Sequence, residues 1–270
     1  MDFIKELIAR FIQHEGPSKA AELSYYFLLS LFPFMIFLLS FTAYLPLSPQ
    51  DVLGVIKQYA PGEVSSMLES NVTETLDNRN GGLLSFGILA ALWSASNGLE
   101  AIVRSFNVAY EVEENRSFIV VRLTSIILTV AMVFTIIIAL LLPVFGREIG
   151  MFVSDFIGAS STFITVWEAL RYIISITILL VIFSALYFFA PNKRLHFAYV
   201  FPGAIIATVG WIVVSTLFSY YVSSFSNYSA TYGSIGGIIV LMTWLYLSGI
   251  MILIGGEINA LIYKRKIQAS

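Results

Sequence analysis

The chain has 270 residues, of which 58% are hydrophobic and 12% are charged, and its formal net charge is −2. A soluble domain carries about 25% charged residues, so this composition excludes an ordinary soluble domain. The negative balance, with no basic patch beyond residues 263–266, argues against a nucleic-acid partner. The absence of cysteine excludes disulfides and thiol nucleophiles.

Residues 1–22 predict a cytoplasmic amphipathic helix. Phe3, Leu7, Ile8 and Phe11 recur at the spacing of one helical face. Charged residues interrupt the apolar ones, and no small-residue cleavage site follows a short apolar core. The segment therefore does not have the features of a cleavable signal peptide.

The apolar runs in the rest of the chain are long enough to cross a hydrocarbon core, which takes about 20 helical residues. They do not alternate between apolar and polar residues, as the strands of a membrane barrel do. We therefore expect an all-α polytopic membrane protein, with residues 1–270 forming a single integral membrane domain. The six expected transmembrane helices cover residues 23–47, 82–101 with a continuation towards 107, 118–145, 166–190, 197–222 and 234–263.

The distribution of Lys and Arg predicts the direction of these spans. Eleven of these residues flank one side of the membrane and four flank the other. The positive-inside rule then places both termini in the cytoplasm, and we expect a bacterial plasma-membrane location. The loop 48–81 becomes extracytoplasmic, and its helix-start residues Ser48, Pro49 and Asp51 predict short acidic helices there.

The sequence lacks the common signatures of an enzyme. His14 and His196 are its only histidines, and no paired-histidine motif, glycine-rich phosphate loop or nucleophile elbow is present. We therefore expect a protein that is not an enzyme and that uses no metal and no cofactor.

Three carboxylates are expected at one level of the membrane. A rise of 1.5 Å per residue places Glu100 about 26 Å, and Glu257 about 33 Å, from the outer ends of their spans. Both then lie at the inner boundary of a core about 30 Å thick, where Glu22 also lies. This layer forms either interfacial ion pairs and helix caps, or a cytoplasmic gate or substrate vestibule. The candidate gate residues of the layer are Glu22, Asn97, Glu100, Arg104, Arg122, Glu257 and Asn259.

The last two spans carry a polar stripe and several glycines. Trp211 and Ser215 are one turn apart, and Tyr220 lies near the outer end. In a transporter these three residues are candidates to line the path of the substrate. Gly236 and Gly237 predict either close helix packing or a broken helix that faces a cavity.

Three long segments carry a family resemblance. They are "SKAAELSYYFLLSLFPFMIFLLS", "NGLEAIVRSFNVAYEVEENRSF" and the run from "FPGAIIATVGW" to "GGEINA". Together they resemble the YihY/BrkB family of bacterial inner-membrane proteins, in the same order and over nearly the whole chain. The resemblance implies a six-span membrane protein, and the family's labels include virulence factor and ribonuclease BN. This sequence has no metal-ligand cluster and no basic RNA-binding face to support a ribonuclease.

Three functions remain open at this stage. The first is a transporter or exporter of a small amphiphile, lipid or osmolyte, with the lipid bilayer as its surroundings. The second is a non-transporting scaffold or envelope-assembly protein. The third and weakest is a membrane-embedded enzyme. Substrate, direction, coupling ion and oligomeric state do not follow from the sequence.

Overall fold

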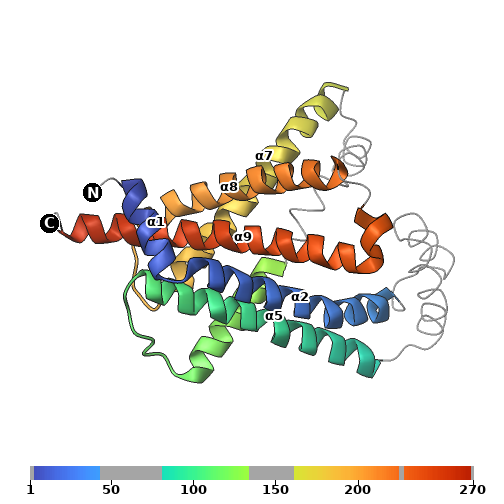
Figure 1. Ribbon diagram of the computed structural model, residues 1–270, viewed down its shortest axis with the longest axis horizontal. Coiled ribbons are helices and arrows are strands. Elements are labelled where there is room, and N and C mark those ends of the chain that lie inside the picture. Colours follow the sequence, from blue (N-terminus) through green and yellow to red (C-terminus); the bar gives the residue numbers. More distant parts are fainter. Residues whose placement is uncertain (1–2, 43–80, 134–160, 225–227, 269–270) are drawn as a thin grey trace. The chain divides into compact units, whose positions relative to one another are not determined.

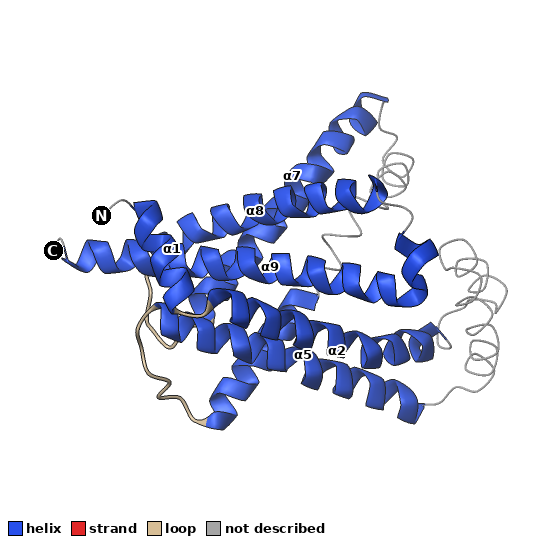
Figure 2. Cartoon of the chain, viewed as in Figure 1, coloured by secondary structure: helices blue, strands red, loops and turns tan. Residues whose placement is uncertain are grey.

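The computed structural model describes residues 3–42, 81–133, 161–224 and 228–268 (Figure 1). These residues form mostly long helices, and no strand occurs among them (Figure 2). The expected all-α class is therefore confirmed. The helices are α1 (Phe3–Gln13), α2 (Gly16–Thr42), α5 (Gly81–Ala109), a shorter helix Phe118–Val133, α7 (Ser161–Phe189), α8 (Phe197–Ser224) and α9 (Tyr228–Gln268).

Five of these helices contain apolar stretches long enough to cross a membrane. They are Gly16–Phe37, Leu84–Ala109, Leu170–Phe189, Phe197–Val222 and Gly236–Gln268. The apolar helix Phe118–Val133 covers the start of the third expected span, and the remainder of that span lies outside the described residues. The chain is thus a polytopic membrane protein, and the count of six spans stays a prediction. The expected helices of the loop 48–81 also lie outside the described residues.

The N-terminal segment 1–22 contains a break that its apolar spacing does not predict. α1 ends at Gln13, and α2 begins at Gly16. Between them Glu15 has a φ of 57°, in the left-handed region that ends helices. At Gly16 an added Cβ would collide with the ring of Phe11, so a larger residue there would require this ring to move.

Contacts between Cα atoms divide the chain into two compact units. One comprises residues 1–25 and 96–270, and the other comprises residues 26–95. In the second unit α2 and α5 approach closely, because a Cβ on Gly87 would lie 2.7 Å from the backbone nitrogen of Phe37. Small residues permit such close approaches between membrane helices.

In the first unit α8 packs on both α7 and α9. The closest point of the α8–α9 contact is at Gly203 and Gly255, where an added Cβ on either residue would collide with the other helix or with Tyr187. The Tyr187 hydroxyl donates a hydrogen bond of 2.8 Å to the carbonyl of Ile252. α7, α8 and α9 are therefore joined at a single buried point.

Candidate functional site

Glu22, Glu100 and Arg104 form an ion-pair network on the surface of the first unit. Arg104 Nη1 donates to Glu100 at 3.0 Å, and Arg104 Nη2 donates to Glu22 at 2.7 Å. Arg122 Nη1 donates to Asn97 Oδ1 at 2.6 Å and to the second carboxylate oxygen of Glu100 at 3.3 Å. These five residues are called the surface cluster below. The structure thus brings together five of the seven candidate residues of the charge layer.

The remaining carboxylate of the layer, Glu257, belongs to a different group of residues. His14 Nδ1 lies 2.5 Å from its Oε1, and Arg10 Nε lies 3.4 Å from its Oε2. Arg10 also donates to Glu111 at 2.9 Å and to the carbonyl of Ala109 at 2.6 Å. Arg10, His14 and Glu257 are called the buried cluster below, and Glu111, whose side chain is 53% exposed, lies at its edge. The structure thus places Glu257 in a different hydrogen-bonded group from Glu22 and Glu100.

The buried cluster connects three helices of different kinds. Arg10 comes from α1, Glu257 comes from the transmembrane helix α9, and the Ala109 carbonyl ends α5. The side chains of Arg10 and Glu257 are 9% and 6% exposed, so their charges are almost fully removed from solvent. A buried charge is stable only when it is paired and hydrogen-bonded. α1 therefore supplies the charge balance of a carboxylate that lies within a span.

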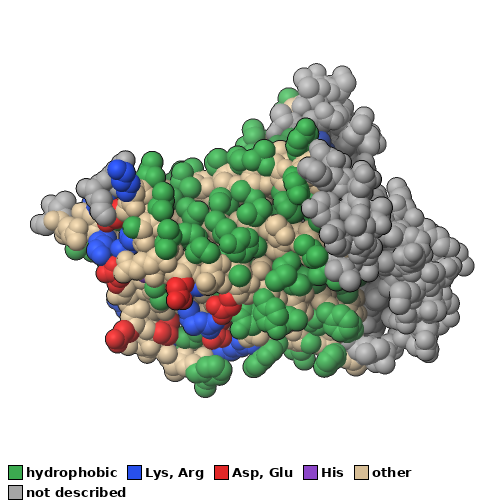
Figure 3. Space-filling model, viewed as in Figure 1, with side chains coloured by type: hydrophobic (Ala, Val, Ile, Leu, Met, Phe, Trp, Pro, Cys, Tyr) green, Lys and Arg blue, Asp and Glu red, His purple; other side chains and the backbone are tan. Residues whose placement is uncertain are grey.

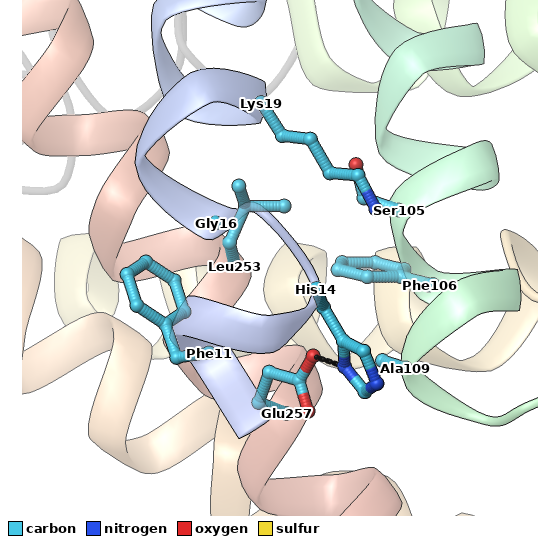
Figure 4. Close-up of a pocket in the computed structure, with 9 residues that line it drawn as sticks. All are labelled: Phe11, His14, Gly16, Lys19, Ser105, Phe106, Ala109, Leu253 and Glu257. Carbon is cyan, nitrogen blue, oxygen red and sulfur yellow. Dashed lines mark hydrogen bonds and ion pairs between the residues drawn. The ribbon is translucent and has the colours of Figure 1, made fainter. Parts of the chain in front are cut away.

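A small cavity lies beside this cluster (Figure 4). His14, Lys19 and Glu257 line it together with Ser105, Phe106 and apolar atoms of α1 and α9. Its volume is about 10 Å³, which is the room of about one water molecule. In this conformation the cavity is too small for an amphiphile.

The end of α5 is shaped so that Glu111 can reach the buried cluster. Glu111 has a φ of 54°, and Val112 donates to the carbonyl of Asn107 in the pattern of a Schellman helix end. Glycine is the usual residue in this conformation. Here a glutamate adopts it, and its side chain contacts the buried cluster. Hydrogen bonds from Lys264 and then Arg10 hold the pKa of the Glu111 carboxyl below its usual value.

The loop after α5 carries a further polar group. Asn107 donates to Glu114 at 2.8 Å and accepts from the backbone of Asn192 at 2.7 Å. Arg116 binds Glu114 and also donates to the carbonyl of Ala190 at 3.0 Å, after the end of α7. Hydrogen bonding by Arg116 lowers the pKa of the Glu114 carboxyl. Arg10 and Arg116 thus satisfy carbonyls at helix ends, so part of the charge layer has a structural role.

Asn259, another predicted gate residue, is fully buried between α9 and α8. Its Oδ1 accepts from the backbone nitrogen of Gly203 at 2.7 Å, and its Nδ2 donates to the carbonyl of Val200 at 2.9 Å. Pro202 lies in this part of α8 and has no N–H of its own. Asn259 therefore fastens α9 to the backbone of α8 on both sides of Pro202.

The residues predicted to line a path lie elsewhere. Trp211 of α8 donates to Ser248 of α9 at 3.1 Å, and Trp244 of α9 donates to Ser215 of α8 at 3.1 Å. The two indoles also meet edge to face, with centroids 6.0 Å apart. Tyr220 is 74% exposed. Trp211 and Ser215 thus occupy a helix–helix contact, and the transport role of all three residues stays a prediction.

The predicted glycine feature has a mixed outcome. α9 is helical from Tyr228 through Gly236 and Gly237, so the described backbone contains no unwound segment there. A Cβ added to Gly237 would meet nothing within 4 Å. Close packing at Gly237 is therefore wrong, because this residue has open space around it.

A second, larger cavity is apolar. Leu128, Ala131 and Met132 line it on one side, and Val181, Ile182, Ala185 and Leu186 of α7 line it on the other. Its volume is about 180 Å³. None of the predicted gate residues lines this groove.

Within the described ranges no group of three or more His, Cys, Asp or Glu side chains is arranged to hold a metal ion. The sequence does not reveal the roles of Arg10, which counts there only among the basic flanking residues, and of His14, which stands there only as one of two histidines. Their spacing of four places them on one face of a helix, and this was the one local signal available. Nothing local could have paired them with Glu257, which is 243 residues beyond His14.

Comparisons with known proteins agree with this architecture. Residues 7–270 match the family model described as "Virulence factor BrkB". The chain is 70% identical over 266 residues to the "Putative ribonuclease-like protein YfkH" of Bacillus subtilis, covering 98% of this chain and 97% of that protein. It is also 25% identical to a "UPF0761 membrane protein" of Chromohalobacter salexigens, covering 97% of this chain and 63% of that protein.

A further UPF0761 membrane protein, from a Psychrobacter species, is 25% identical and matches over 96% of this chain and 48% of its own length. No solved structure matches the chain. The family match covers nearly the whole sequence and all the helices described above. The chain therefore belongs to the BrkB family of bacterial membrane proteins.

Proposed function

We propose that the protein is a transporter or exporter of a small amphiphile, lipid or osmolyte in the bacterial plasma membrane, with both termini in the cytoplasm. One observation carries the proposal. Glu257 is buried in a transmembrane helix, yet its partners Arg10 and His14 come from α1 and from the turn that follows it. α1 has 11 residues and is about 16 Å long, too short to span the membrane.

Such an arrangement favours two states of the inner end. With α1 docked, the Glu257 carboxylate is paired and its cavity holds about one water. With α1 displaced, the carboxylate would face the cytoplasm and the ends of α5 and α9 would be uncovered. Intramembrane carboxylates commonly mark ion or substrate pathways. We therefore interpret the described conformation as one that is closed at the cytoplasmic side.

The scaffold hypothesis has its own supporting observation. The surface cluster lies outside both cavities, and its Arg104 and Glu22 side chains are 50% and 38% exposed. A charged surface of this kind suits contact with headgroups or with another protein as well as it suits a gate. The proposal does not use the ribonuclease label of the Bacillus subtilis relative, because among the described residues no group of three or more His, Cys, Asp or Glu side chains is arranged to hold a metal ion.

The test is metabolite and lipid profiling of a strain that lacks the protein, complemented with wild type, Glu257→Gln or Glu100→Gln. A transporter predicts that one chemical class accumulates in the deletion strain, that wild type reverses this, and that Glu257→Gln does not when its membrane level is equal. Glu15→Gln, in the turn before α2, is the matched control and should complement. Full complementation by both Glu257→Gln and Glu100→Gln would overturn the proposal. Envelope defects without any accumulating class would favour the scaffold.

A further inference from the structure

The surface cluster lies at the depth of lipid headgroups. After Glu22, α2 runs for 20 residues, 23–42, without a charged residue. At 1.5 Å per residue this is about 30 Å, the thickness of the hydrocarbon core. α5 likewise has no charged residue before Glu100. Two separate helices thus place their first charge at the same boundary.

The cluster is open to its surroundings on one side. The side chains of Arg104, Glu22 and Glu100 are 50%, 38% and 23% exposed. Tyr25, one turn after Glu22 on α2, is 51% exposed, as is typical of aromatic residues at a membrane interface. Figure 3 shows acidic and basic side chains gathered beside hydrophobic ones towards the end where both termini lie.

Hydrogen-bonding capacity remains in the exposed part of the cluster. A guanidinium has five N–H groups, and Arg104 uses one for Glu100 and one for Glu22. Three N–H groups of Arg104 therefore donate to none of the described residues. Glu22 accepts from Arg104 through Oε1, and its Oε2 accepts from no described residue. An unsatisfied donor set and an unsatisfied carboxylate oxygen thus lie side by side.

The charge balance selects the kind of ligand. Arg104 and Arg122 are matched by Glu22 and Glu100, so these four side chains together carry no net charge, and Lys19 lies near enough to Glu22 and Arg104 to interact electrostatically with both. A purely anionic headgroup would meet Glu22 as well as Arg104 and would gain little. A headgroup with both a phosphate and a primary ammonium complements both open groups, because phosphate accepts from Arg104 and ammonium donates to Glu22.

We propose that the surface cluster binds the headgroup of a phospholipid that carries a primary ammonium, of the phosphatidylethanolamine type. The phosphate lies on the free N–H groups of Arg104, and the ammonium lies on Oε2 of Glu22. Asn97 accepts a hydrogen bond from Arg122, Arg122 holds Glu100, and Glu100 in turn orients the Arg104 guanidinium. The site is independent of the proposed transport, since binding here requires no movement of α1 and no substrate.

The experiment measures lipid binding to the purified full-length protein by native mass spectrometry. Three lipids with identical acyl chains are titrated: phosphatidylethanolamine, phosphatidylcholine and phosphatidylglycerol. The first should bind about threefold to tenfold more tightly than either of the others, as expected for one charge-assisted hydrogen bond. The choline lipid keeps the phosphate but has no N–H for Glu22, so it isolates the ammonium contact without any mutation.

Two variants then assign the site. In Glu22→Gln the ethanolamine lipid and the choline lipid should bind with about equal affinity. Arg104→Gln should weaken the binding of both lipids. Glu6→Gln is the matched control, since Glu6 forms a similar ion pair of 2.6 Å with Arg265 outside the cluster. Equal binding of the three lipids, a preference for phosphatidylglycerol, or an ethanolamine preference unchanged in a folded Glu22→Gln protein would overturn the inference.

Discussion

Asn259 is the residue whose role changes most between sequence and structure. Its position beside Glu257 predicts a gate residue. In the structure, however, both the oxygen and the nitrogen of its side-chain amide form hydrogen bonds with the backbone of α8. In Asn259→Leu the buried N–H of Gly203 and the buried carbonyl of Val200 would both lose their side-chain partner. We expect a loss of about 1–3 kcal/mol in the free energy of unfolding, measured by denaturant titration in detergent.

Thr216→Ala is a control for Asn259, because Thr216 is exposed on α8 and its hydroxyl bonds only within its own helix. It should change the free energy of unfolding by less than about 0.5 kcal/mol. If Asn259→Leu is as stable as Thr216→Ala, the two hydrogen bonds of the Asn259 amide do not stabilise the α8–α9 contact.

Glycine has opposite roles at two positions of α9. At Gly255 an added Cβ would collide with the Tyr187 hydroxyl and lie 2.8 Å from the carbonyl oxygen of Gly203, while at Gly237 it would meet open space. Gly255→Ala should therefore destabilise the protein by about 1–3 kcal/mol, as overpacking does. Gly237→Ala should be neutral or stabilising by up to about 1 kcal/mol, since alanine favours the helix. Equal melting temperatures for the two variants would contradict this assignment.

At the scale of elements, the reciprocal Trp–Ser pairs fix how α8 lies along α9. Each helix supplies one indole and, four residues on, one hydroxyl, so a shift of either helix would break both bonds together. Ser215→Ala and Ser248→Ala should each cost about 0.5–1.5 kcal/mol in free energy of unfolding. Because the two indoles touch, the double variant should depart from additivity in a double-mutant cycle. Strict additivity would mean that the two pairs act independently.

The loop after α5 should make the fold sensitive to acid. The pKa of Glu114 is lower in the folded protein than its ordinary value of 4.5, owing first to Arg116. Its contribution to stability is therefore present above pH 4.5 and lost as the pH falls through the lower folded value. Glu114→Gln should flatten the fall in melting temperature between about pH 5 and pH 3. Glu113→Gln, whose carboxylate forms no ion pair with the described residues, should follow the wild-type profile.

The helices could be predicted from sequence because each depends on local information: a long apolar run has few alternatives in a membrane. The Glu100–Arg104 pair could be predicted for the same reason, since four residues separate its members on one helix. The break at Glu15 could not, because glutamate has no preference for a positive φ. The partners of Glu257 could not either, because Arg10 is 247 residues away and only the packing of α1 on α9 brings them together.

At the scale of the whole molecule, α1 is held mainly by charge. Arg10 and His14 bind Glu257, and Glu6 binds Arg265 near the end of α9. The apolar residues Ile4, Ile8 and Ile12 of the same helix are 62%, 53% and 65% exposed, so they add little to docking on the described residues. Such a row of exposed apolar residues suits the membrane interface. Phe11, by contrast, lines the cavity beside Glu257 together with Phe106 and Leu253, so displacement of α1 would uncover this small apolar contact as well as the ion pairs.

Glu257→Gln should consequently loosen α1 while the spans remain folded. The chain contains no cysteine, so two spin labels can be placed at Ile8→Cys and Ile267→Cys without removing native thiols. In the wild-type background we expect one narrow distance distribution between the labels. With Glu257→Gln, Arg10 loses a buried partner and His14 loses its charged one, and we expect the distribution to broaden or shift to longer distances. Glu15→Gln should leave it narrow. An unchanged narrow distribution in Glu257→Gln would show that the carboxylate does not hold α1, and the two-state interpretation of the inner end would then lose its physical basis.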